Sequence, residues 1–347
     1  MSRARVGIVN DLKLAREVLR EIVASDTRFE VCWYAEDGVE AIARCAGDPP
    51  DIVLMDLLMP KLDGVGATRA IMAATPCPIL VVTATVQGNL ALVYEAMGLG
   101  ALDAVMTPTR GNPSSAREAQ NLLRKMHAVL ALARGMAAGA SREQLPEARA
   151  TAAVPQILAI GSSTGGPAAV ETILRALPGD FPAAILVAQH IDKEFVQGFV
   201  DWLRSRIRLG VRLARQGEPV QAAQVFVANS HAHMVLGPGG HLGYVDGPPG
   251  ALYRPSVDVL FDSVSRNAPS GSTGVLLTGI GRDGASGLLA MRRAGLRTIA
   301  QDRDSCVVYG MPAAAAEIGA AEQILPVDRI AAQLLSLHTL HTLRSPA

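Results

Sequence analysis

The segment from Ile157 to Val170, ILAIGSSTGGPAAV, joins an apolar run to an alanine-rich run through a turn of small residues. A short apolar run that ends in glycine and serine predicts a buried strand, and the alanine-rich run predicts the helix after it. Pro167 suits the first turn of that helix, where a backbone N–H would have no acceptor. The turn could present a nucleophilic serine, cradle a phosphate, or connect the two elements without any chemistry.

The same alternation of apolar runs and helical patterns extends along the chain on both sides of this segment. Candidate strands are RVGIVN, FEVCWYA, DIVLMD, CPILVVTA and LDAVMT in the first half, and ILAIG, AAILVAQH, QVFVAN, TGVLLTG, LRTIAQD and EQILPV in the second. Repeated strand–helix units place the strands in parallel, with helices on both faces of the sheet. We therefore expect an α/β protein with two doubly wound parallel-sheet domains. A Gly/Pro-rich interruption at residues 237–250 suggests a hairpin in the second.

A change of pattern near the middle of the chain separates the two units. A helical pattern is followed by residues 139–156, GASREQLPEARATAAVPQ, which are polar, small and without periodicity. This composition is typical of a linker. We expect a first domain at residues 1–125, a helical extension and linker at 126–153, and a second domain at 154–347.

The composition limits the classes of protein to which the chain can belong. It has 347 residues, with 32 Lys and Arg against 32 Asp and Glu, so its formal net charge is zero. Without a basic excess, nucleic acid and anionic lipid are not expected as partners. The four cysteines have no C-x-x-C spacing. No apolar run approaches the roughly 18 residues of a membrane span. We expect a soluble cytoplasmic protein with reduced thiols.

Acidic and hydroxyl side chains follow the predicted strands of the first domain. Asp11, Asp56, Thr83 and Thr107 each end or follow a strand. Ligands gather at the carboxyl edge of a doubly wound sheet, and two carboxylates at this edge could hold Mg²⁺. A cation beside Asp56 would let its carboxylate accept a phosphoryl group, because the cation neutralises the incoming charge. A simple role as turn formers or helix caps is the alternative for the aspartates.

The motifs GIVND, DIVLMDLLMPKLDGV, ILVVTAT and GALDAVMTPT, in this order, resemble the receiver domain of response regulators. The resemblance implies a flavodoxin-like fold, with Asp56 as the phosphoacceptor, Asp11 as a Mg²⁺ ligand and Thr83 as the hydroxyl that senses the phosphoryl group. Two positions depart from the family, because Asn10 stands where an acid is usual and Thr107 where a lysine is usual. Thr107 cannot form the charge-assisted bond of a lysine to phosphate, which is worth roughly 1.5–3 kcal/mol. We therefore expect phosphorylation at Asp56 with weaker metal binding or altered switching.

Known loop patterns narrow the chemistry of the GSSTGG turn. A phosphate-binding P-loop, G-x-x-x-x-G-K-S/T, needs a lysine where Pro167 stands, and the glycines do not fit G-x-G-x-x-G. The turn does match G-x-S-x-G through Gly161, Ser163 and Gly165, a pattern that projects a nucleophilic serine from a sharp strand-to-helix turn. The N–H groups at the helix start could stabilise an oxyanion. A Ser/Gly turn without chemistry remains the alternative, because a five-residue pattern is weak.

A serine nucleophile needs a base and a group that orients the base. Of the seven histidines, His190 directly ends a buried-type strand, at the same sheet edge as Ser163. His231 and His233 form an H-x-H pair near a turn, where solvated polar side chains are expected rather than metal ligands. Asp283 lies at another strand end, in VLLTGIGRDGASG. Ser163, His190 and Asp283 therefore form a candidate trio, each from a different strand end.

The surroundings of this trio resemble the catalytic domain of CheB, the chemotaxis-type protein-glutamate methylesterase. The motifs are AIGSSTGGP, VAQHI, RPSVDVLFDS, LLTGIGRDGASGL and CVVYGMPAAA. The resemblance implies a Rossmann-like three-layer fold with Ser163 as the nucleophile, His190 as the general base and then acid, and Asp283 as the residue that orients the imidazole. It also implies that Thr164 N–H contributes to the oxyanion hole. Ile280 stands where the family usually has methionine, an apolar exchange that should leave the trio intact.

The same resemblance implies the activity and the partners. The activity would be hydrolysis of glutamate methyl esters on chemoreceptor helices, with deamidation of certain receptor glutamines as a second reaction. A methyl-accepting chemoreceptor would be the substrate and a chemotaxis-type histidine kinase the phosphodonor, with Mg²⁺ needed for receiver phosphorylation and no cofactor for catalysis. The unphosphorylated receiver would cover the catalytic cleft. GIVNDLKLA and GALDAVMTP further resemble the WspF-like subgroup, whose surface-sensing pathway ends in a diguanylate cyclase.

Other classes of protein fit the sequence less well. A general α/β-hydrolase has the chain order Ser, acid, His, whereas His190 precedes Asp283. A DNA-binding response regulator would need a basic helix-turn-helix output, whereas the second half is a near-neutral α/β unit. A catalytically idle receiver-adaptor that sequesters receptor or kinase remains the alternative, because every catalytic residue could be present without activity.

Overall fold

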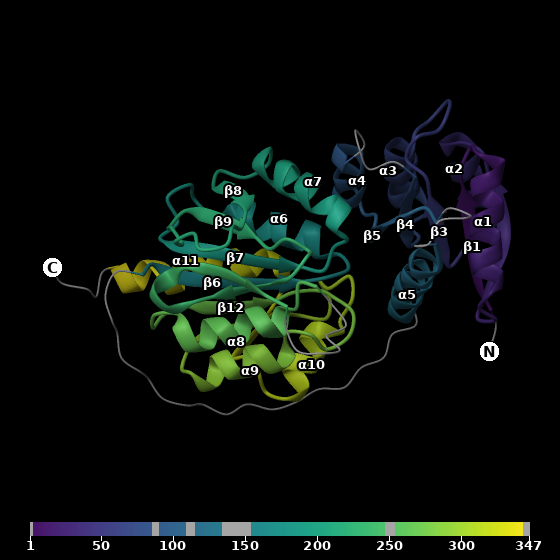
Figure 1. Cartoon of the computed structure of the whole chain (residues 1–347). Coiled ribbons are helices and arrows are strands. Elements are labelled where there is room, and N and C mark those ends of the chain that lie inside the picture. Colours follow the sequence, from purple (N-terminus) through teal and green to yellow (C-terminus); the bar gives the residue numbers. More distant parts are fainter. Residues whose placement is uncertain (1–2, 85–89, 109–114, 134–153, 247–253, 343–347) are drawn as a thin grey trace. The chain divides into compact units, whose positions relative to one another are not determined.

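The computed structural model describes residues 3–84, 90–108, 115–133, 154–246 and 254–342 (Figure 1). The chain divides into two units, Met1–Met136 and Ala137–Ala347. The division falls within the segment that is predicted to be a helical extension and linker, and residues 134–153 of that segment lie outside the described residues. Each unit is built around its own parallel sheet.

The first unit contains a five-stranded parallel sheet with the order β2-β1-β3-β4-β5. Its elements are β1 (Ala4–Val9), α1 (Lys13–Ala24), β2 (Phe29–Ala35), α2 (Gly38–Gly47), β3 (Ile52–Met55), α3 (Gly64–Ala74), β4 (Ile79–Thr83), α4 (Leu90–Gly98), β5 (Asp103–Met106) and α5 (Ser115–Ala133). This strand order defines the flavodoxin-like fold. The predicted fold of the first domain and its five strands are therefore confirmed.

Helices cover both faces of the first sheet. Helices α1 and α5 contact each other on one face, and α2, α3 and α4 form a row on the other. Alternate residues of β1, Ala4, Val6 and Ile8, point into a core cluster shared with α1 and α5, as the two-residue period of a strand requires. Asp37 caps the N-terminus of α2, and Asp63 caps that of α3, through hydrogen bonds from backbone N–H groups. These caps fix the loops at the carboxyl edge of the sheet.

The second unit contains a seven-stranded parallel sheet with the order β14-β13-β12-β6-β7-β9-β8. Its elements are β6 (Gln156–Ser162), α6 (Gly166–Ala176), β7 (Ala183–Gln189), α7 (Lys193–Arg204), β8 (Gly210–Leu213), β9 (Gln224–Val227), β10 (His233–Leu236), η1 (Pro238–Gly240), β11 (Leu242–Val245), α8 (Val257–Asn267), β12 (Thr273–Leu276), α9 (Ala285–Arg293), β13 (Arg297–Gln301), α10 (Met311–Glu317), β14 (Gln323–Leu325) and α11 (Val327–Thr342).

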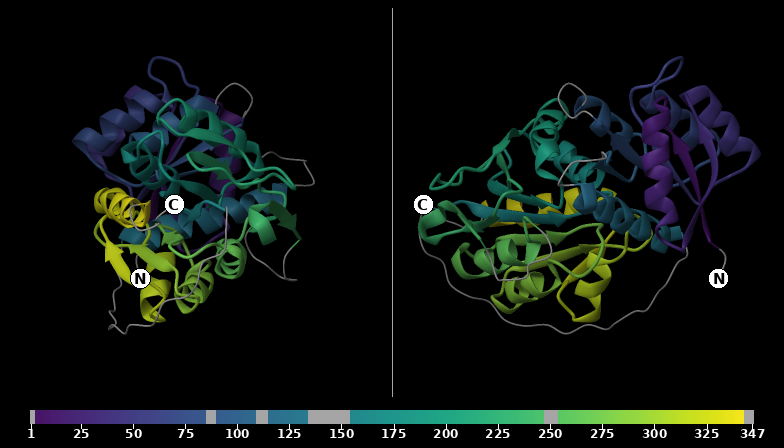
Figure 2. Two further views of the ribbon diagram at one scale, coloured as in Figure 1. Left: turned by 90° about the vertical axis from the view of Figure 1, so that its left-hand side faces the viewer. Right: turned by 45° about the vertical axis from the view of Figure 1, so that its right-hand side comes forward.

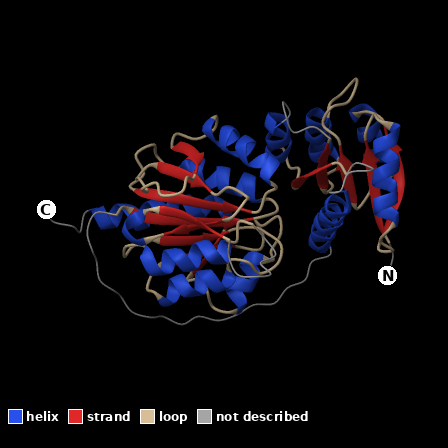
Figure 3. Cartoon of the chain, viewed as in Figure 1, coloured by secondary structure: helices blue, strands red, loops and turns tan. Residues whose placement is uncertain are grey.

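The second unit has three layers, as predicted. Helices α8, α9 and α10 lie along one face of the sheet, and α6, α7 and α11 lie along the other (Figures 2 and 3). One core cluster of the second unit joins alternate residues of β6 and β7 to the apolar sides of α8, α9 and α10. The chain extends the sheet in opposite directions from β6 and from β12, so the topological switch point lies between these two strands. Ligands of doubly wound sheets bind at the carboxyl ends of the strands at this point, which here are β6, β7 and β12.

Two details of the second unit add to the sequence-based expectation. Strand β8 is an edge strand of four residues, GVRL, that the sequence patterns did not indicate. The expected hairpin is present as the antiparallel pair β10 and β11, which forms a separate two-stranded sheet. Residues 247–250 of the Gly/Pro-rich interruption lie outside the described residues.

Candidate functional site

Ser163 lies directly after β6, in the turn before α6. Its backbone N–H donates to Thr278 O, just after β12, at 2.9 Å. The N–H of Gly166 donates to Ser163 O at 2.8 Å and closes the turn. Gly165 has a φ of 74°, and a Cβ at this position would collide with the side chain of Val307. The predicted strand–turn–helix unit is confirmed, with Ser163 in its turn.

The two adjacent serines have different surroundings. The hydroxyl of Ser162 donates to Oε1 of Gln189 at 2.6 Å, and the side chain is fully buried at 0% exposure. Ser163 keeps 6% of its surface exposed. Ser162 is therefore committed to an internal hydrogen bond, whereas Ser163 is buried but keeps a small exposed fraction.

His190 follows the last residue of β7, next to the turn that carries Ser163. Its backbone N–H donates to Ser162 O at 2.9 Å, which continues the pairing of β6 with β7. Its ring nitrogen Nε2 lies 2.8 Å from Oδ2 of Asp283, and the two side chains are 7% and 10% exposed. The structure therefore brings together Ser163 and His190, which directly follow β6 and β7, and Asp283, which lies in the loop just before α9 rather than at the end of β12.

The carboxylate of Asp283 is held by the N-terminus of α8 as well as by His190. Oδ1 accepts from the Ser256 hydroxyl at 2.8 Å and from Asp258 N–H at 3.0 Å, and Oδ2 accepts from Val257 N–H at 2.7 Å. Burial alone would raise the pKa of Asp283, but the hydrogen bonds from His190 and these N–H groups lower it to about 2. Asp283 is therefore a fixed anion beside the imidazole, which is the requirement for orienting a base.

Ser256 is a site residue that the sequence patterns did not single out. Its hydroxyl also accepts from Val259 N–H at 3.3 Å, so it caps α8 while it donates to Asp283. The signal was present in the sequence as a serine directly before the helical pattern VDVLFDS, which is typical of an N-cap. What the sequence could not indicate is that this helix begins at the site.

Gln189 is a second residue that the sequence patterns did not single out. Its amide nitrogen Nε2 donates to Ser163 O at 2.7 Å and to His190 O at 3.0 Å, while Oε1 accepts from Ser162. A Cβ on Gly166 would collide with Oε1 of Gln189, so the start of α6 also packs against this amide. One buried side chain thus joins the backbones of the candidate nucleophile and the candidate base.

The end of β12 supports the other side of the turn. The Thr278 hydroxyl donates to Thr164 O at 2.9 Å and accepts from Val308 N–H at 2.7 Å. A Cβ on Gly279 would lie 2.7 Å from Cβ of Ser163, so the two backbone segments are in direct contact there. Thr164 is buried and Ile280 is half-buried beside these residues. Thr164 thus lies in the supported turn, and the oxyanion role of its N–H stays a prediction.

The expectation that His233 is a solvated side chain is wrong. Its ring is fully buried, and Nδ1 accepts from Ser256 N–H at 2.9 Å. Burial, with help from the charge of Arg254, lowers the pKa of this imidazole. His233 therefore fixes the backbone of the residue that caps α8.

The candidate phosphorylation site lies at the carboxyl edge of the first sheet. Asp56 follows β3 and is buried, with Oδ2 accepting from Asn10 Nδ2 at 2.7 Å and Oδ1 accepting from Leu57 N–H at 2.7 Å. Burial raises the pKa of Asp56 to about 6, and the nearby charge of Asp11 raises it as well. Asn10 directs its oxygen to Leu12 N–H at 2.9 Å, so its nitrogen and not its oxygen faces Asp56.

These residues fit a hard divalent cation. Asp11 is exposed beside the buried Asp56, and the two carboxylates are close enough for Asp11 to raise the pKa of Asp56. Such a pair of oxygen donors with uncompensated charge is the chemistry that Mg²⁺ prefers. Within the described residues, no cluster of three or more His, Cys, Asp or Glu side chains forms a metal site. Any cation would therefore be held by two carboxylates, backbone oxygens and water.

Thr83 and Thr107 lie side by side at the next two strand ends. Thr83 ends β4, and Thr107 N–H donates to Thr83 O at 2.9 Å. Both side chains are buried, and the Thr107 hydroxyl has no hydrogen-bond partner among the described residues. The position that usually carries a lysine thus places a short, uncharged side chain next to Thr83.

The fold and the two sites define a two-domain response regulator whose second domain has the layout of a serine-dependent α/β enzyme. Residues 6–113 match the family model of the response regulator receiver domain, and residues 158–334 match that of CheB methylesterase. The chain belongs to the CheB methylesterase family, in its receiver-linked form.

Similar proteins cover almost the whole chain. A protein-glutamate methylesterase/protein-glutamine glutaminase 3 of Burkholderia orbicola is 51% identical over 95% of this chain and 97% of its own length. A protein-glutamate methylesterase/protein-glutamine glutaminase 4 of Burkholderia thailandensis is 52% identical over 96% of this chain and 97% of its own length. The crystal structure of the CheB methylesterase catalytic domain of Thermotoga maritima is 34% identical, with a TM-score of 0.51 over 53% of this chain and 100% of that chain. None of the described helices is long and apolar enough to cross a membrane.

Proposed function

We propose that the chain is a phosphorylation-regulated protein-glutamate methylesterase that uses Ser163, His190 and Asp283. The observation that carries the proposal is the 2.8 Å pairing of His190 Nε2 with the anchored carboxylate of Asp283, beside the turn that carries Ser163. A buried Asp–His pair next to a serine in a strand-to-helix turn is the arrangement that activates a hydroxyl. The family membership and the names of the similar proteins support the same reaction.

The reaction would proceed in two steps. Ser163 Oγ attacks the ester carbonyl while its proton passes to His190, and N–H groups at the start of α6 stabilise the oxyanion. His190 then returns the proton to the leaving methoxide, which departs as methanol and leaves an acyl-enzyme. Water, deprotonated by His190, attacks the acyl-enzyme and releases free glutamate and Ser163. Because Nε2 of His190 faces Asp283, Nδ1 is the ring nitrogen that exchanges the proton.

The substrate would be a glutamate methyl ester on the cytoplasmic helices of a methyl-accepting chemoreceptor. Both similar Burkholderia proteins are also named protein-glutamine glutaminases, which supports deamidation of receptor glutamines as a second reaction. Deamidation follows the same steps with ammonia as the leaving group. No cofactor enters either reaction, and we place the enzyme in the cytoplasm with neither nucleic acid nor membrane as a direct partner.

The first unit would regulate this activity through phosphorylation of Asp56 by a chemotaxis-type histidine kinase. Asp11 and Asp56 would hold Mg²⁺, which neutralises charge on the incoming phosphoryl group, and Thr83 would bond to that group after transfer. The unphosphorylated receiver would cover the catalytic cleft, so removal of residues 1–150 should raise esterase activity. Unchanged or lower activity of the shortened chain would count against this regulation. We place the pathway with the WspF-like, surface-sensing systems that end in cyclic-di-GMP synthesis.

The deciding experiment is demethylation of a purified, methylated chemoreceptor by the full chain, with and without acetyl phosphate. Release of methanol that rises with phosphodonor would support the proposal. Binding of the receptor without methanol release would favour the alternative function, a receiver-adaptor that sequesters receptor or kinase. The alternative is weaker because Asp283 is held by four hydrogen-bond donors, one of them the imidazole of His190.

A further inference from the structure

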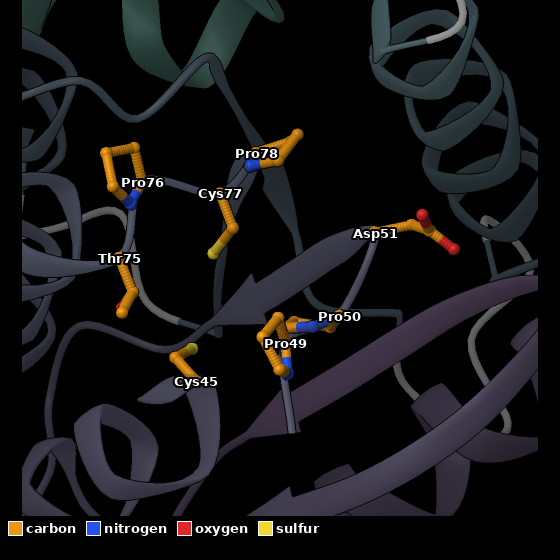
Figure 4. Close-up of a pocket in the computed structure, with 8 residues that line it drawn as sticks. All are labelled: Cys45, Pro49, Pro50, Asp51, Thr75, Pro76, Cys77 and Pro78. Carbon is orange, nitrogen blue, oxygen red and sulfur yellow. The ribbon is translucent and has the colours of Figure 1, made fainter. Parts of the chain in front are cut away.

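Two thiols lie together in the first unit, at the sheet edge opposite Asp56. Cys45 belongs to α2, and Cys77 lies between α3 and β4. Both line a pocket of about 400 Å³ whose other walls are Pro49, Pro50, Asp51, Thr75, Pro76 and Pro78. In Figure 4 the Cys77 side chain extends towards Cys45, and the Asp51 side chain points away from both.

The walls of this pocket hold the thiols in place. Cys77 stands between Pro76 and Pro78, whose rings fix φ on both sides and keep the intervening residue extended. The carboxylate of Asp51 accepts from Arg5 N–H at 2.7 Å and is therefore engaged away from the sulfur atoms. Cys45 is 1% exposed and Cys77 is 7% exposed, and the pocket that both residues line is the path by which a small oxidant would approach them. The pocket is a small site whose reactive groups are two adjacent thiols.

The two thiols have different pKa values because they share a side-chain hydrogen bond. The hydrogen bond from Cys77 stabilises a thiolate on Cys45 and lowers the pKa of Cys45 below its usual value. The same bond and burial raise the pKa of Cys77. Burial also raises the pKa of Cys32 and of Cys306. Thiolates are the form that reacts with oxidants, so Cys45 is the favoured first target among the four cysteines.

We propose that Cys45 and Cys77 are a peroxide-sensitive dithiol that closes to a reversible disulfide within the receiver. The Cys45 thiolate attacks one oxygen of hydrogen peroxide, the O–O bond breaks, and Cys45 becomes a sulfenic acid as hydroxide leaves and takes up a proton. Cys77 sulfur then attacks the Cys45 sulfur and expels water. In total two thiols are oxidised by two electrons and one peroxide is reduced to two waters. A small dithiol reductant reverses the reaction by thiol–disulfide exchange.

The test is oxidation of the folded full chain with hydrogen peroxide, followed by alkylation of the remaining thiols and mass spectrometry. We expect loss of two of the four thiols, a mass decrease of about 2 Da before alkylation, and one linked peptide pair that contains Cys45 and Cys77. Dithiothreitol should restore all four thiols. The matched controls Cys32→Ser and Cys306→Ser should behave like the unmodified chain.

Variants of the pair separate the two steps. Cys77→Ser should leave a sulfenic acid on Cys45 that reacts with dimedone, whereas Cys45→Ser should give no linked peptide and little adduct. Thermal unfolding of each variant, with Cys45→Ala and Cys77→Ala as apolar replacements, shows that the receiver is folded in the assay. A linked pair that includes Cys32 or Cys306, or four thiols that survive peroxide in the folded chain, would overturn the proposal. The result does not depend on esterase activity.

Discussion

The hydroxyl of Ser162 donates to Oε1 of Gln189 at 2.6 Å, and this bond distinguishes two serines that are neighbours in the chain. Ser162 is the last residue of β6, where its side chain is buried against β7. Ser163 is the next residue, in the turn, where its backbone is held by Thr278 and Gln189 and its side chain reaches the edge of the sheet. Mutation of Ser163 should therefore lower activity and leave stability nearly unchanged, whereas mutation of Ser162 should lower stability and leave the nucleophile in place.

Ser163→Ala should lower kcat for ester hydrolysis by about four orders of magnitude or more, because removal of a triad nucleophile leaves only binding and oxyanion stabilisation. The free energy of unfolding should be nearly unchanged. Ser162→Ala is the matched control. It leaves the buried Oε1 of Gln189 without a donor, which costs about 1–3 kcal/mol of stability, while the nucleophile remains. Methanol release from methylated receptor and urea unfolding measure both effects, and equal kcat losses in the two variants would contradict the assignment.

Gln189→Ala should lower kcat by about tenfold to a hundredfold with little change in KM. The amide joins Ser163 O to His190 O, and its loss lets the nucleophile and the base drift apart, to which catalytic rates are sensitive. KM should be less affected because the Gln189 side chain is buried, so it contacts other protein groups and not the substrate.

The control for this variant is Gln156→Ala, at the opposite end of β6. Oε1 of Gln156 accepts from His338 Nδ1 at 2.6 Å, so this variant also loses a side-chain hydrogen bond of the same sheet, far from the site. We expect it to lower stability without lowering kcat. A Gln189→Ala enzyme that loses stability but turns over at the original rate would show that the residue is structural only.

The layers, the parallel strands and the strand ends that carry Ser163 and His190 could be predicted because they depend on local patterns. Buried parallel strands are continuous apolar runs, and the residue after each run, such as His190, must lie at the carboxyl edge. Strand β8 could not be predicted in the same way. Its sequence GVRL contains a glycine and an arginine, because an edge strand needs no continuous apolar run.

The supporting groups of the site could not be predicted because they join residues that are distant in the sequence. Ser256 meets Asp283 across 27 positions and Gln189 meets Ser162 across 27, and nothing in either local pattern points to the partner. The sequence pattern wrongly predicts an exposed His233 for a related reason. An H-x-H pair near a turn is typical of exposed loops, whereas here the second histidine begins β10 and accepts a hydrogen bond from Ser256. Burial of a polar residue is decided by the partner that satisfies it.

Asp283→Asn should lower kcat by about four orders of magnitude and also weaken the pH dependence of stability. The pKa of Asp283 is lowered to about 2 in the folded protein, below the usual value of 3.8. A lowered pKa stabilises the fold above the unfolded-state pKa, and this contribution is lost as the pH falls from about 4 to about 2. For this shift it amounts to about 2 kcal/mol.

Urea unfolding of the full chain at pH 6 and near pH 3 measures the second effect. The unmodified chain should lose more stability between the two pH values than Asp283→Asn does, because the variant has no charge to protonate at this position. Asp262→Asn is the matched control, because Asp262 is a half-exposed carboxylate on α8 that pairs with Arg266 rather than with the site, so this variant should lose as much stability as the unmodified chain. An Asp283→Asn chain with the same loss of stability on acidification would contradict the anchored-anion interpretation.

Asp56→Asn should abolish labelling of the chain by acetyl phosphate, and Asn10→Asp should make the labelling depend more steeply on Mg²⁺. Asn10 Nδ2 donates to Asp56 Oδ2 at 2.7 Å, so the change to aspartate removes a donor and adds a negative charge next to a carboxyl whose pKa is already raised to about 6. Without Mg²⁺ the added charge favours protonation of Asp56 and should reduce labelling. With Mg²⁺ the extra carboxylate should tighten cation binding by about tenfold, or ~1.4 kcal/mol. The two dependences should therefore cross as Mg²⁺ is raised.

Asp51→Asn, which alters a carboxylate at the opposite edge of the sheet, serves as the control and should label like the unmodified chain. Labelling that persists in Asp56→Asn, or an Asn10→Asp curve parallel to that of the unmodified chain, would contradict the assignment of Asp56 and its neighbours as the phosphorylation site.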